Sequence, residues 1–310
     1  MYRMSLQSYS KHGSSDEKEK KVIVPSNPYF PATDFVEMRT TKDKTGKSTM
    51  DKLKQFNSEL QGSSCHSDKE ISMLGGLLNA TISTSSCTSP TTEQVQILHS
   101  ILTKWPEDKL LPALDIFRLA VAHPFVNEYL CNSDSCDAMI EEVIKRVMEN
   151  DNISVQMLLC RGICNSFIQP HGLEFLSNPK TRNSIIDAVL KLKDIEEGST
   201  PMPNQKRVGL RIAATTLFRN FAVALHAKQQ HDWHLVNAIA DMLEKENDTG
   251  SNFRLLVALG TLMVDDYEAV LIARNRKVLE HLTKFLGREG ATDKVGDCAY
   301  FLSKLMRDTA

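Results

Sequence analysis

Four long and mostly apolar helical stretches recur in this sequence, roughly every 40 to 50 residues. In each of them the apolar residues follow the helical period of about 3.6 residues and fill two adjoining faces, so that only one narrow polar stripe remains. A helix of this kind is buried on most of its circumference, and the shorter, more charged stretches between the four fit a stack of helical repeats. The four stretches cover residues 108–122, 154–167, 205–226 and 252–264.

Helical patterns follow one another from residue 68 to residue 306, and no apolar alternation with a period of two is long enough to require a sheet. The sequence therefore predicts an all-α protein, an armadillo-like helical-repeat superhelix or solenoid, over residues 27–310. A large helical bundle is the alternative, because it also mixes buried and half-buried helices.

The N-terminal part of the chain differs in composition from the helical part. Residues 1–26 are rich in Ser and Lys and contain too few apolar residues to form a core, which predicts a disordered tail or linker. Residues 27–67 follow as a predicted extended segment that docks onto the helical domain, since Phe30 and Phe35 stand there between prolines and turn-forming residues.

Composition limits the partners and the compartment. The formal net charge of -2 gives no overall attraction to nucleic acid or to an anionic membrane, and no apolar run reaches the roughly 18 residues of a membrane span. We therefore expect neither nucleic acid nor a membrane as a partner. The seven cysteines are an odd number scattered over helical stretches, which favours reduced thiols and a cytoplasmic and nuclear location.

No constellation of residues predicts catalysis, a cofactor or a bound metal. Cys160 and Cys164 lie one helical turn apart without the spacing of a redox or zinc motif, and we interpret them as buried thiols. An enzyme with one of them as nucleophile is the alternative, although no signature links a histidine to either cysteine. His226, His231 and His234 are close enough in sequence to hold a metal, but a polar turn between two helices is the favoured interpretation.

Each of the four long stretches carries polar side chains on its narrow stripe: Arg118, Arg161 with Asn165, Asn220, and Arg254. An arginine pairs with a carboxylate through two hydrogen bonds, and an asparagine amide can bond both the N–H and the C=O of an extended peptide. If the long helices stack in parallel, these side chains form a ladder that would bind a peptide with acidic residues or a free C-terminal carboxylate. Two alternatives remain open: the groups satisfy contacts between repeats, or the chain's own N-terminal segment fills the groove.

The last of the four stretches shows the narrow stripe most clearly. Arg254, Ala258, Thr261 and Asp265 follow one another at helical spacing, with a cation first and small side chains after it. We expect this stripe to be exposed, and an arginine beside small side chains is suited to receive an extended peptide. From these residues alone, the favoured interpretation is that Arg254 only covers apolar surface with its stem and keeps its guanidinium in water.

Three well-separated segments carry a family resemblance: ALDIFRLAVAHPFVNEYLC at residues 113–131, LLCRGICNSF at 158–167 and FRLLVALGTLMVDD at 253–266. Together with NPYFPATDF at residues 27–35 they resemble the PUL domain family of ubiquitin-pathway cofactors, the phospholipase A-2-activating proteins. The resemblance implies an armadillo-like, non-catalytic adaptor with a positively charged concave groove. That groove is expected to bind the C-terminal tail of the hexameric AAA ATPase valosin-containing protein in ubiquitin-dependent protein degradation.

The resemblance also implies roles for particular residues. Two groove arginines that matter for tail binding in the family match Arg118 and Arg254, while Arg161, Asn165 and Asn220 fall on groove-lining helices. Family members usually carry a propeller and a ubiquitin-binding domain that do not fit into the segment before residue 29, so we expect ubiquitin to be reached only through domains absent from this chain. The domain also occurs beside thiol isopeptidases, and a scaffold accompanying such an enzyme, which acts on ubiquitin-like modifiers, is the alternative function.

Overall fold

The structure is a computed structural model of the 310-residue chain, and it describes residues 27–39, 46–82, 89–132, 137–192, 195, 205–286 and 293–309. The predicted disordered tail, residues 1–26, lies outside the described residues. Within the described residues the regular elements are helices and there is no strand, which confirms the all-α prediction. The α-helices are α1 (Lys47–Ser58), α2 (Asp68–Ile82), α3 (Thr92–Lys104), α4 (Leu111–Ala120), α5 (Pro124–Cys131), α6 (Asp137–Met148), α7 (Ile153–Ser166), α8 (Pro170–Ser177), α9 (Pro179–Leu190), α11 (Gln205–Ala227), α12 (Trp233–Lys245), α13 (Thr249–Met263), α14 (Tyr267–Asn275), α15 (Val278–Leu282) and α16 (Lys294–Asp308); two short 3-10 helices cover Gly62–Ser64 and Glu107–Lys109.

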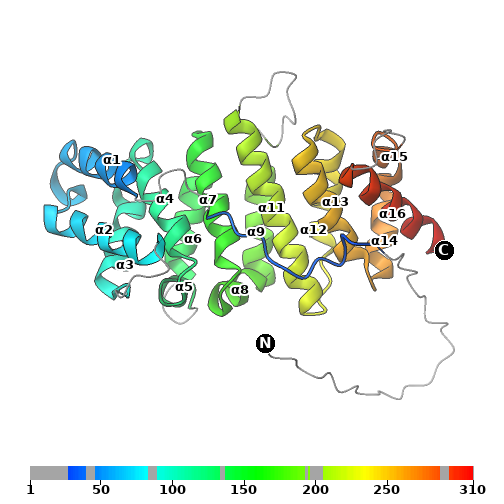
Figure 1. Cartoon of the computed structure of the whole chain (residues 1–310), viewed down its shortest axis with the longest axis horizontal. Coiled ribbons are helices and arrows are strands. Elements are labelled where there is room, and N and C mark those ends of the chain that lie inside the picture. Colours follow the sequence, from blue (N-terminus) through cyan, green and yellow to red (C-terminus); the bar gives the residue numbers. More distant parts are fainter. Residues whose placement is uncertain are drawn as a thin grey trace, which may run out of the picture.

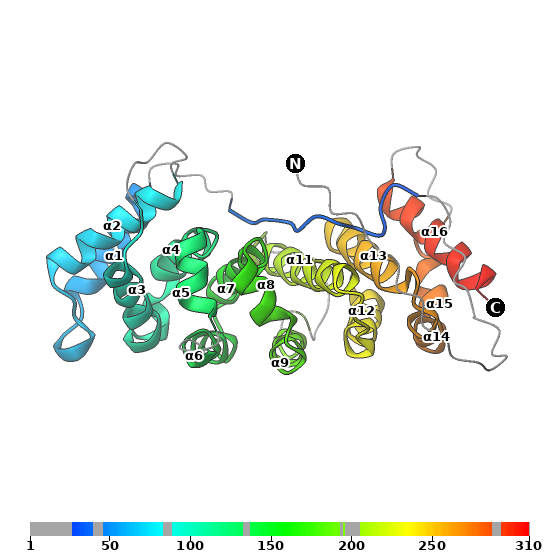
Figure 2. The ribbon, with the colours of Figure 1, turned by 90° about the horizontal axis from the view of Figure 1, so that it is seen from below.

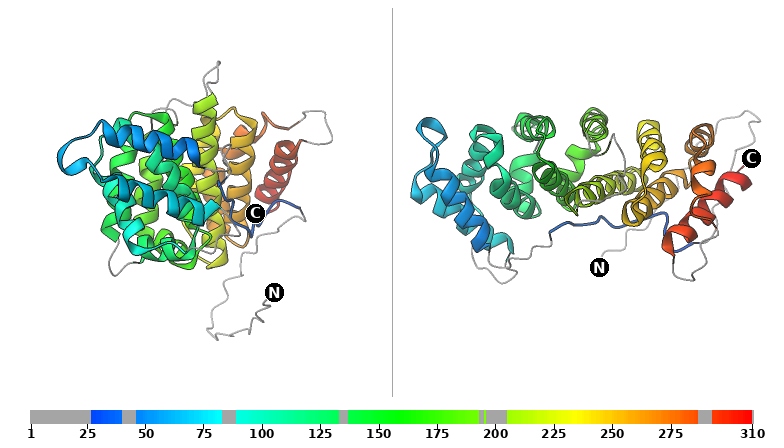
Figure 3. Two further views of the ribbon diagram at one scale, coloured as in Figure 1. Left: turned by 60° about the vertical axis from the view of Figure 1, so that its left-hand side comes forward. Right: turned by 90° about the horizontal axis from the view of Figure 1, so that it is seen from above.

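The helices stack into a curved, two-layered array that runs from α1 to α16 (Figures 1 and 2). One layer contains the four predicted long helices followed by α16: α4 packs on α7, α7 on α11, α11 on α13, and α13 on α16. Helices α6, α9, α12 and α14 form the other layer on the convex side, as the edge-on views show (Figures 2 and 3). Because each long helix is sandwiched by its neighbours, its apolar circumference is buried, as in a helical-repeat solenoid.

Polar caps set where several of the helices begin. The side chains of Asn152, Asn178, Asp232, Asp248 and Asp266 each accept a hydrogen bond from a backbone N–H in the first turn of the following helix. Such a cap satisfies one of the N–H groups that have no partner within the helix and contributes about 1 kcal/mol. Helices α5, α8 and α9 in addition have proline in the first turn, where the missing N–H costs nothing.

Helix α11 is the centre of the apolar core. It is the one helix in the described part of the chain that is long and apolar enough to cross a membrane, yet 78% of that stretch is buried inside the solenoid. Its aromatic residues Phe218 and Phe221 are fully buried, and they pack among residues of α7 and α13. The length and apolar character of α11 therefore follow from its place between two other inner helices.

An extended segment, residues 27–39, crosses the concave face of the array (the blue trace in Figure 2). We call this segment the strap. It runs across the inner helices from α16, past α13 and α11, to α7, and the chain enters α1 at Lys47. Within the predicted extended segment, residues 27–67, the strap covers residues 27–39 and helix α1 covers Lys47–Ser58.

Candidate peptide-binding groove

The concave face holds the strap by side-chain amides that were predicted to bind an extended peptide. Asn220 on α11 accepts a hydrogen bond from the backbone N–H of Val36 at 2.9 Å and donates one to the carbonyl oxygen of Val36 at 3.1 Å. Asn165 on α7 accepts from the N–H of Met38 at 2.6 Å. Both asparagines are fully buried, because the strap covers them. The same amides also donate to neighbouring inner helices, Asn165 to the carbonyl oxygen of Arg118 at 2.6 Å and Asn220 to that of Cys164 at 3.3 Å. Both alternatives left open by the sequence therefore describe these residues: they join neighbouring helices, and residues 27–39 occupy this part of the groove.

A side chain of α13 likewise bonds the backbone of the strap at its other end. Thr261 accepts a hydrogen bond from the N–H of Ala32 at 2.9 Å, and the ring of Phe30 is buried against Gly260. A Cβ atom on Gly260 would lie 2.5 Å from that ring, so the close approach of strap and helix requires a glycine here. Ala258 and Thr261, which the sequence led us to expect on an exposed stripe, are buried because the strap covers this part of α13.

Aromatic contacts fix the strap at two further points. Phe35 stacks on Phe167 at the end of α7, with ring centroids 5.4 Å apart. Tyr29 packs edge-on against Phe253 of α13 at 5.7 Å, and its hydroxyl donates a hydrogen bond to Asp297 of α16 at 3.1 Å. Stacked and edge-on rings contribute beyond the apolar area that they bury. The strap is therefore an integral part of the domain and not a loosely attached tail.

Two arginines bind carbonyl groups of the strap. Arg118 on α4 is buried; it donates to the carbonyl oxygen of Met38 at 3.1 Å and forms an ion pair with Asp115 at 2.7 Å. Arg219 on α11 donates to the carbonyl oxygen of Asp34 at 2.7 Å. Burial lowers the pKa of Arg219, but an arginine stays protonated in any case. The sequence analysis named Arg118 as a groove residue and overlooked Arg219, whose place next to Asn220 on a groove-lining helix was the available signal.

Arg161 and Arg254 lie beside the strap and do not bind it. Arg161 precedes Asn165 by one turn on α7, and its buried Nε has no hydrogen-bond partner among the described residues. Arg254 precedes Thr261 by two turns on α13 and donates to the carbonyl oxygen of Gly250 at 2.7 Å in its own helix. Burial lowers the pKa of both guanidinium groups, and for Arg161 the nearby Arg118 lowers it further.

The two candidate nucleophiles are unsuited to catalysis. Cys160 and Cys164 are fully buried in α7, as expected from their apolar surroundings. Burial raises the pKa of the Cys160 thiol to about 12 and raises that of Cys164 well above its usual value. A thiol acts as a nucleophile in its ionised form, and these two are held in the neutral form at physiological pH.

The histidine cluster is a set of separate contacts between helices. His231 bonds to Asp266 at 2.6 Å, whereas His234 bonds to Asp187 at 2.8 Å on another helix. Over the described ranges, no three His, Cys, Asp or Glu side chains come together in a way that could hold a metal ion. His231 precedes α12 and bonds to the N-cap residue of α14, whereas His234 in α12 bonds to α9.

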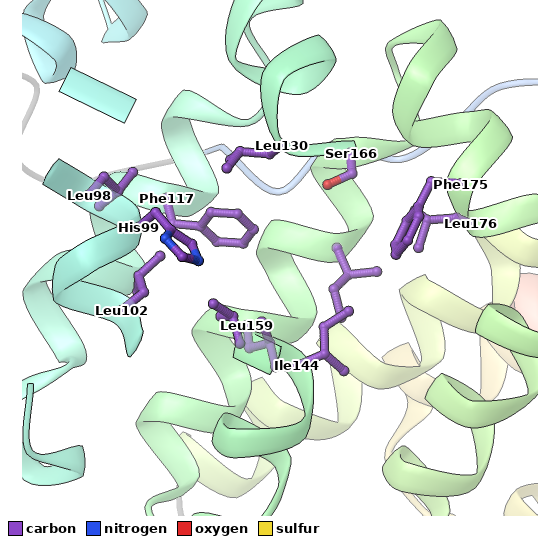
Figure 4. Close-up of a pocket in the computed structure, with 12 residues that line it drawn as sticks. Leu98, His99, Leu102, Phe117, Leu130, Ile144, Leu159, Ser166, Phe175 and Leu176 are labelled. Atoms are coloured by element: carbon purple, nitrogen blue, oxygen red, sulfur yellow. The ribbon is translucent and has the colours of Figure 1, made fainter. Parts of the chain in front are cut away.

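An enclosed apolar cavity lies between α3, α4 and α7, away from the strap (Figure 4). Its volume is about 20 Å³, room for about one water molecule, and Leu98, Phe117 and Leu159 are among its walls. His99 borders it with an unpaired Nε2 atom, and burial lowers the pKa of this histidine. This cavity is too small for a substrate or cofactor, whereas an open pocket of about 600 Å³ lies between α6 and α9 in the other layer. The concave face is the candidate site because the predicted groove residues Asn165 and Asn220 hold an extended chain there.

The fold and the site define the class of protein: a helical-repeat solenoid whose concave face holds an extended chain by buried side-chain amides. More specifically, the chain belongs to the PUL domain family, because the profile of this family matches residues 30–300. This confirms the resemblance found in the sequence.

Two curated relatives share this domain. The phospholipase A-2-activating protein of Xenopus laevis is 29% identical over 283 residues, which are 90% of this chain and 33% of that protein. The ubiquitin fusion degradation protein 3 homolog of Caenorhabditis elegans is 24% identical over 268 residues, 83% of this chain and 29% of that protein. The chain thus spans about a third of the length of the curated relatives it matches.

Two solved structures share the fold. The PFU-PUL domain pair of Saccharomyces cerevisiae Doa1/Ufd3 superposes with a TM-score of 0.58 at 20% identity, over 88% of this chain and 79% of that chain. A structure of a PUL domain with a mutated PFU domain gives a TM-score of 0.57 at 19% identity, over 89% and 79% of the two chains. At such low identity these structures support the architecture alone.

Proposed function

We propose that this chain is a non-catalytic adaptor domain of the ubiquitin-dependent degradation pathway. Its concave groove binds the C-terminal tail of the AAA ATPase valosin-containing protein, in the cytoplasm and the nucleus. Ubiquitin is reached through other domains and not through this one. Membership of the PUL family and the names of the relatives support the pathway.

One observation carries the binding mode, namely that an extended chain already lies in the groove. The strap carries aromatic residues as well as the exposed acids Asp34 and Glu37, which is the composition expected of the tail. Asn165 and Asn220 bond its backbone N–H and C=O groups, and Arg118 and Arg219 bond its carbonyl oxygens. These contacts, which are all to the backbone, support the binding of an extended segment on the concave face.

The expected affinity is moderate and sensitive to salt. A short disordered tail loses conformational freedom when it binds, so we expect a Kd on the order of micromolar. The attraction between arginines and carboxylates at a partly exposed surface is screened within about 8 Å at physiological ionic strength. Raising the salt concentration should therefore weaken binding.

A titration with a synthetic ten-residue peptide from the ATPase C-terminus tests the proposal. We expect saturable binding by the wild-type chain and at least tenfold weaker binding by Arg254→Ala. Arg307→Ala is the matched control, because Arg307 is exposed in the last turn of α16 and its removal changes the net charge equally. Absence of binding by the folded wild-type protein would refute this partner.

A further inference from the structure

The exposed face of the last helix, α16, carries a stripe of charged and aromatic side chains. The opposite face of this helix is buried against α13, α14 and α15, and the helix lies at one end of the array (the red helix in Figures 1 and 2). We call the exposed side chains the α16 stripe: Lys294, Asp297, Tyr300, Lys304, Arg307 and Asp308, together with the half-buried Asp293 and Phe301.

Two aromatic residues stand at the midpoint of the α16 stripe. Tyr300 is 58% exposed, more than any other large apolar residue in the described part of the chain, and its ring centroid lies 5.7 Å from that of Phe301. Tyrosine is among the residue types that contribute most to protein interfaces, because its ring is apolar and its hydroxyl can stay hydrogen-bonded. This pair of rings is therefore suited to form the centre of a contact.

The charges of the α16 stripe have opposite signs at equal distances from this midpoint. Asp297 precedes the midpoint between Tyr300 and Phe301 by as many residues as Lys304 follows it. The acid and the base are about two helical turns apart, so they lie on one line along the helix. Asp297 accepts a hydrogen bond from Tyr29 through Oδ2, which leaves Oδ1 for a second partner, and Lys304 forms no ion pair with another described residue.

The same arrangement continues toward both ends of the α16 stripe. Successive residues of a helix are rotated by about 100°, which places Lys294 and Asp308 on one edge of the exposed face and Asp293 and Arg307 on the other edge. Asp293 is the N-cap residue of α16, and Arg307 lies in its last turn. Each edge thus has a base toward one end of the helix and an acid toward the other.

A second copy of α16 that runs in the opposite direction matches these charges. A two-fold axis perpendicular to both helices brings Asp297 of each copy level with Lys304 of the other copy. The axis also brings the same edge of the two helices together, so that the basic end of each edge meets the acidic end of its copy. A parallel arrangement would instead place Asp297 against Asp297 and Lys304 against Lys304, which is repulsive.

We infer that a second copy of this chain docks on the α16 stripe and forms a two-fold symmetric dimer, in which the α16 helices run antiparallel around Tyr300. Helix α16 has 15 residues and is therefore about 22 Å long, which places the contact at the small end of protein interfaces. Exposed ion pairs each contribute little. The dimer is therefore weak and reversible, with a Kd on the order of 10 to 100 µM, and it does not depend on the proposed function.

Sedimentation velocity of the whole chain at about 1 to 500 µM tests the dimer. We expect the wild type to be monomeric at the lowest concentration and mostly dimeric at the highest. Lys304→Asp, Asp297→Lys and Tyr300→Ala should each weaken dimerisation at least tenfold. The matched controls are the exposed Lys69 on α2, as Lys69→Asp, and the 54% exposed Trp233 on α12, as Trp233→Ala; both should dimerise as the wild type does.

Mixing the two charge variants separates pairing from a general loss of structure. Asp297→Lys and Lys304→Asp each place like charges opposite one another in their own dimers, so each should be mostly monomeric. In an equimolar mixture every introduced charge faces an opposite charge, and a heterodimer should form about as tightly as the wild-type dimer. Loss of the hydrogen bond from Tyr29 in Asp297→Lys cannot produce this rescue. Thermal unfolding followed by circular dichroism shows that each variant is folded.

The outcomes separate this inference from the proposed function. A wild-type chain that stays monomeric at about 500 µM, an equal loss in the two controls, or no heterodimer in the mixture of folded variants overturns the antiparallel dimer. The expected losses together with the rescue establish it. None of these measurements uses the ATPase tail. With the chain at about 1 µM the dimer is dissociated, so the tail titration and its Arg307→Ala control are independent of it.

Discussion

Replacing Asn220 by alanine tests whether buried amides hold the strap. The substitution removes the two hydrogen bonds to Val36 and a third, at 3.3 Å, from the amide nitrogen to the carbonyl oxygen of Cys164. At about 1 kcal/mol for each hydrogen bond, the free energy of unfolding should fall by about 3 kcal/mol. For a chain of this length that loss corresponds to a decrease in Tm of about 6 °C.

Urea unfolding followed by circular dichroism measures the loss, and hydrogen exchange locates it. The N–H of Val36 should be protected in the wild type and exchange faster in Asn220→Ala, because its acceptor is gone. Asn237→Ala is the matched control, since Asn237 bonds only within α12 at the surface and its loss should change stability by less than about 0.5 kcal/mol. A loss below about 1 kcal/mol for Asn220→Ala, with Val36 still protected, would show that the amide does not hold the strap.

Three substitutions and one labelling reaction test separate parts of the structure. Gly260→Ala should lower Tm by several degrees, because the added Cβ would lie 2.5 Å from the ring of Phe30; thermal unfolding at an unchanged Tm would contradict this close approach. Arg118→Met should lower Tm, because it removes a buried ion pair and a hydrogen bond to the strap. Arg161→Met should leave Tm unchanged or higher, because no described group loses a partner. An equal decrease in Tm for both variants would contradict this division of roles between the two arginines. Burial raises the pKa of the Cys160 thiol to about 12, so the thiol is neutral at pH 8. Iodoacetamide should therefore not modify Cys160 in the native protein at pH 8 and should modify it in urea. Rapid labelling of the native protein, detected by mass spectrometry, would refute the burial of this thiol.

The helices could be predicted from the sequence wherever a long apolar periodicity was interrupted by a strong cap or breaker. The stretches predicted at residues 154–167 and 252–264 correspond to α7 (Ile153–Ser166) and α13 (Thr249–Met263). Helix α8 (Pro170–Ser177) is not among the predicted stretches, because its 8 residues are too few to show a helical period and include Gly172, a residue that disfavours a helix interior. In the structure Gly172 stands in the first turn of α8, where a side chain would collide with the backbone of Ser166. The glycine thus serves a close helix contact and not the end of a helix.

Asn165 and Asn220 lie on inner helices, and the chain's own N-terminal segment, one of the occupants left open by the sequence, covers them. Periodicity identifies the face of a helix that differs from the core, and it does not identify what covers that face. Asn165 and Asn220 were taken as partners for an extended peptide, and that peptide is a segment of the same chain far away in sequence. Phe30 in the N-terminal segment and the glycine at position 260 in an otherwise apolar helix were the available signals for this contact.

The strap changes what a ligand of this groove can be recognised by. Armadillo-like amide ladders bind the backbone of any extended chain, and therefore contribute affinity without discriminating between sequences. Here residues 27–39 occupy that ladder, with Asn220 bonded to both polar groups of Val36. If the proposed tail binds while the strap stays in place, we expect that binding to depend mainly on charge, at the predicted groove residues Arg161 and Arg254. Charge complementarity gives specificity and fast association more than affinity, which fits an adaptor that engages its partner reversibly.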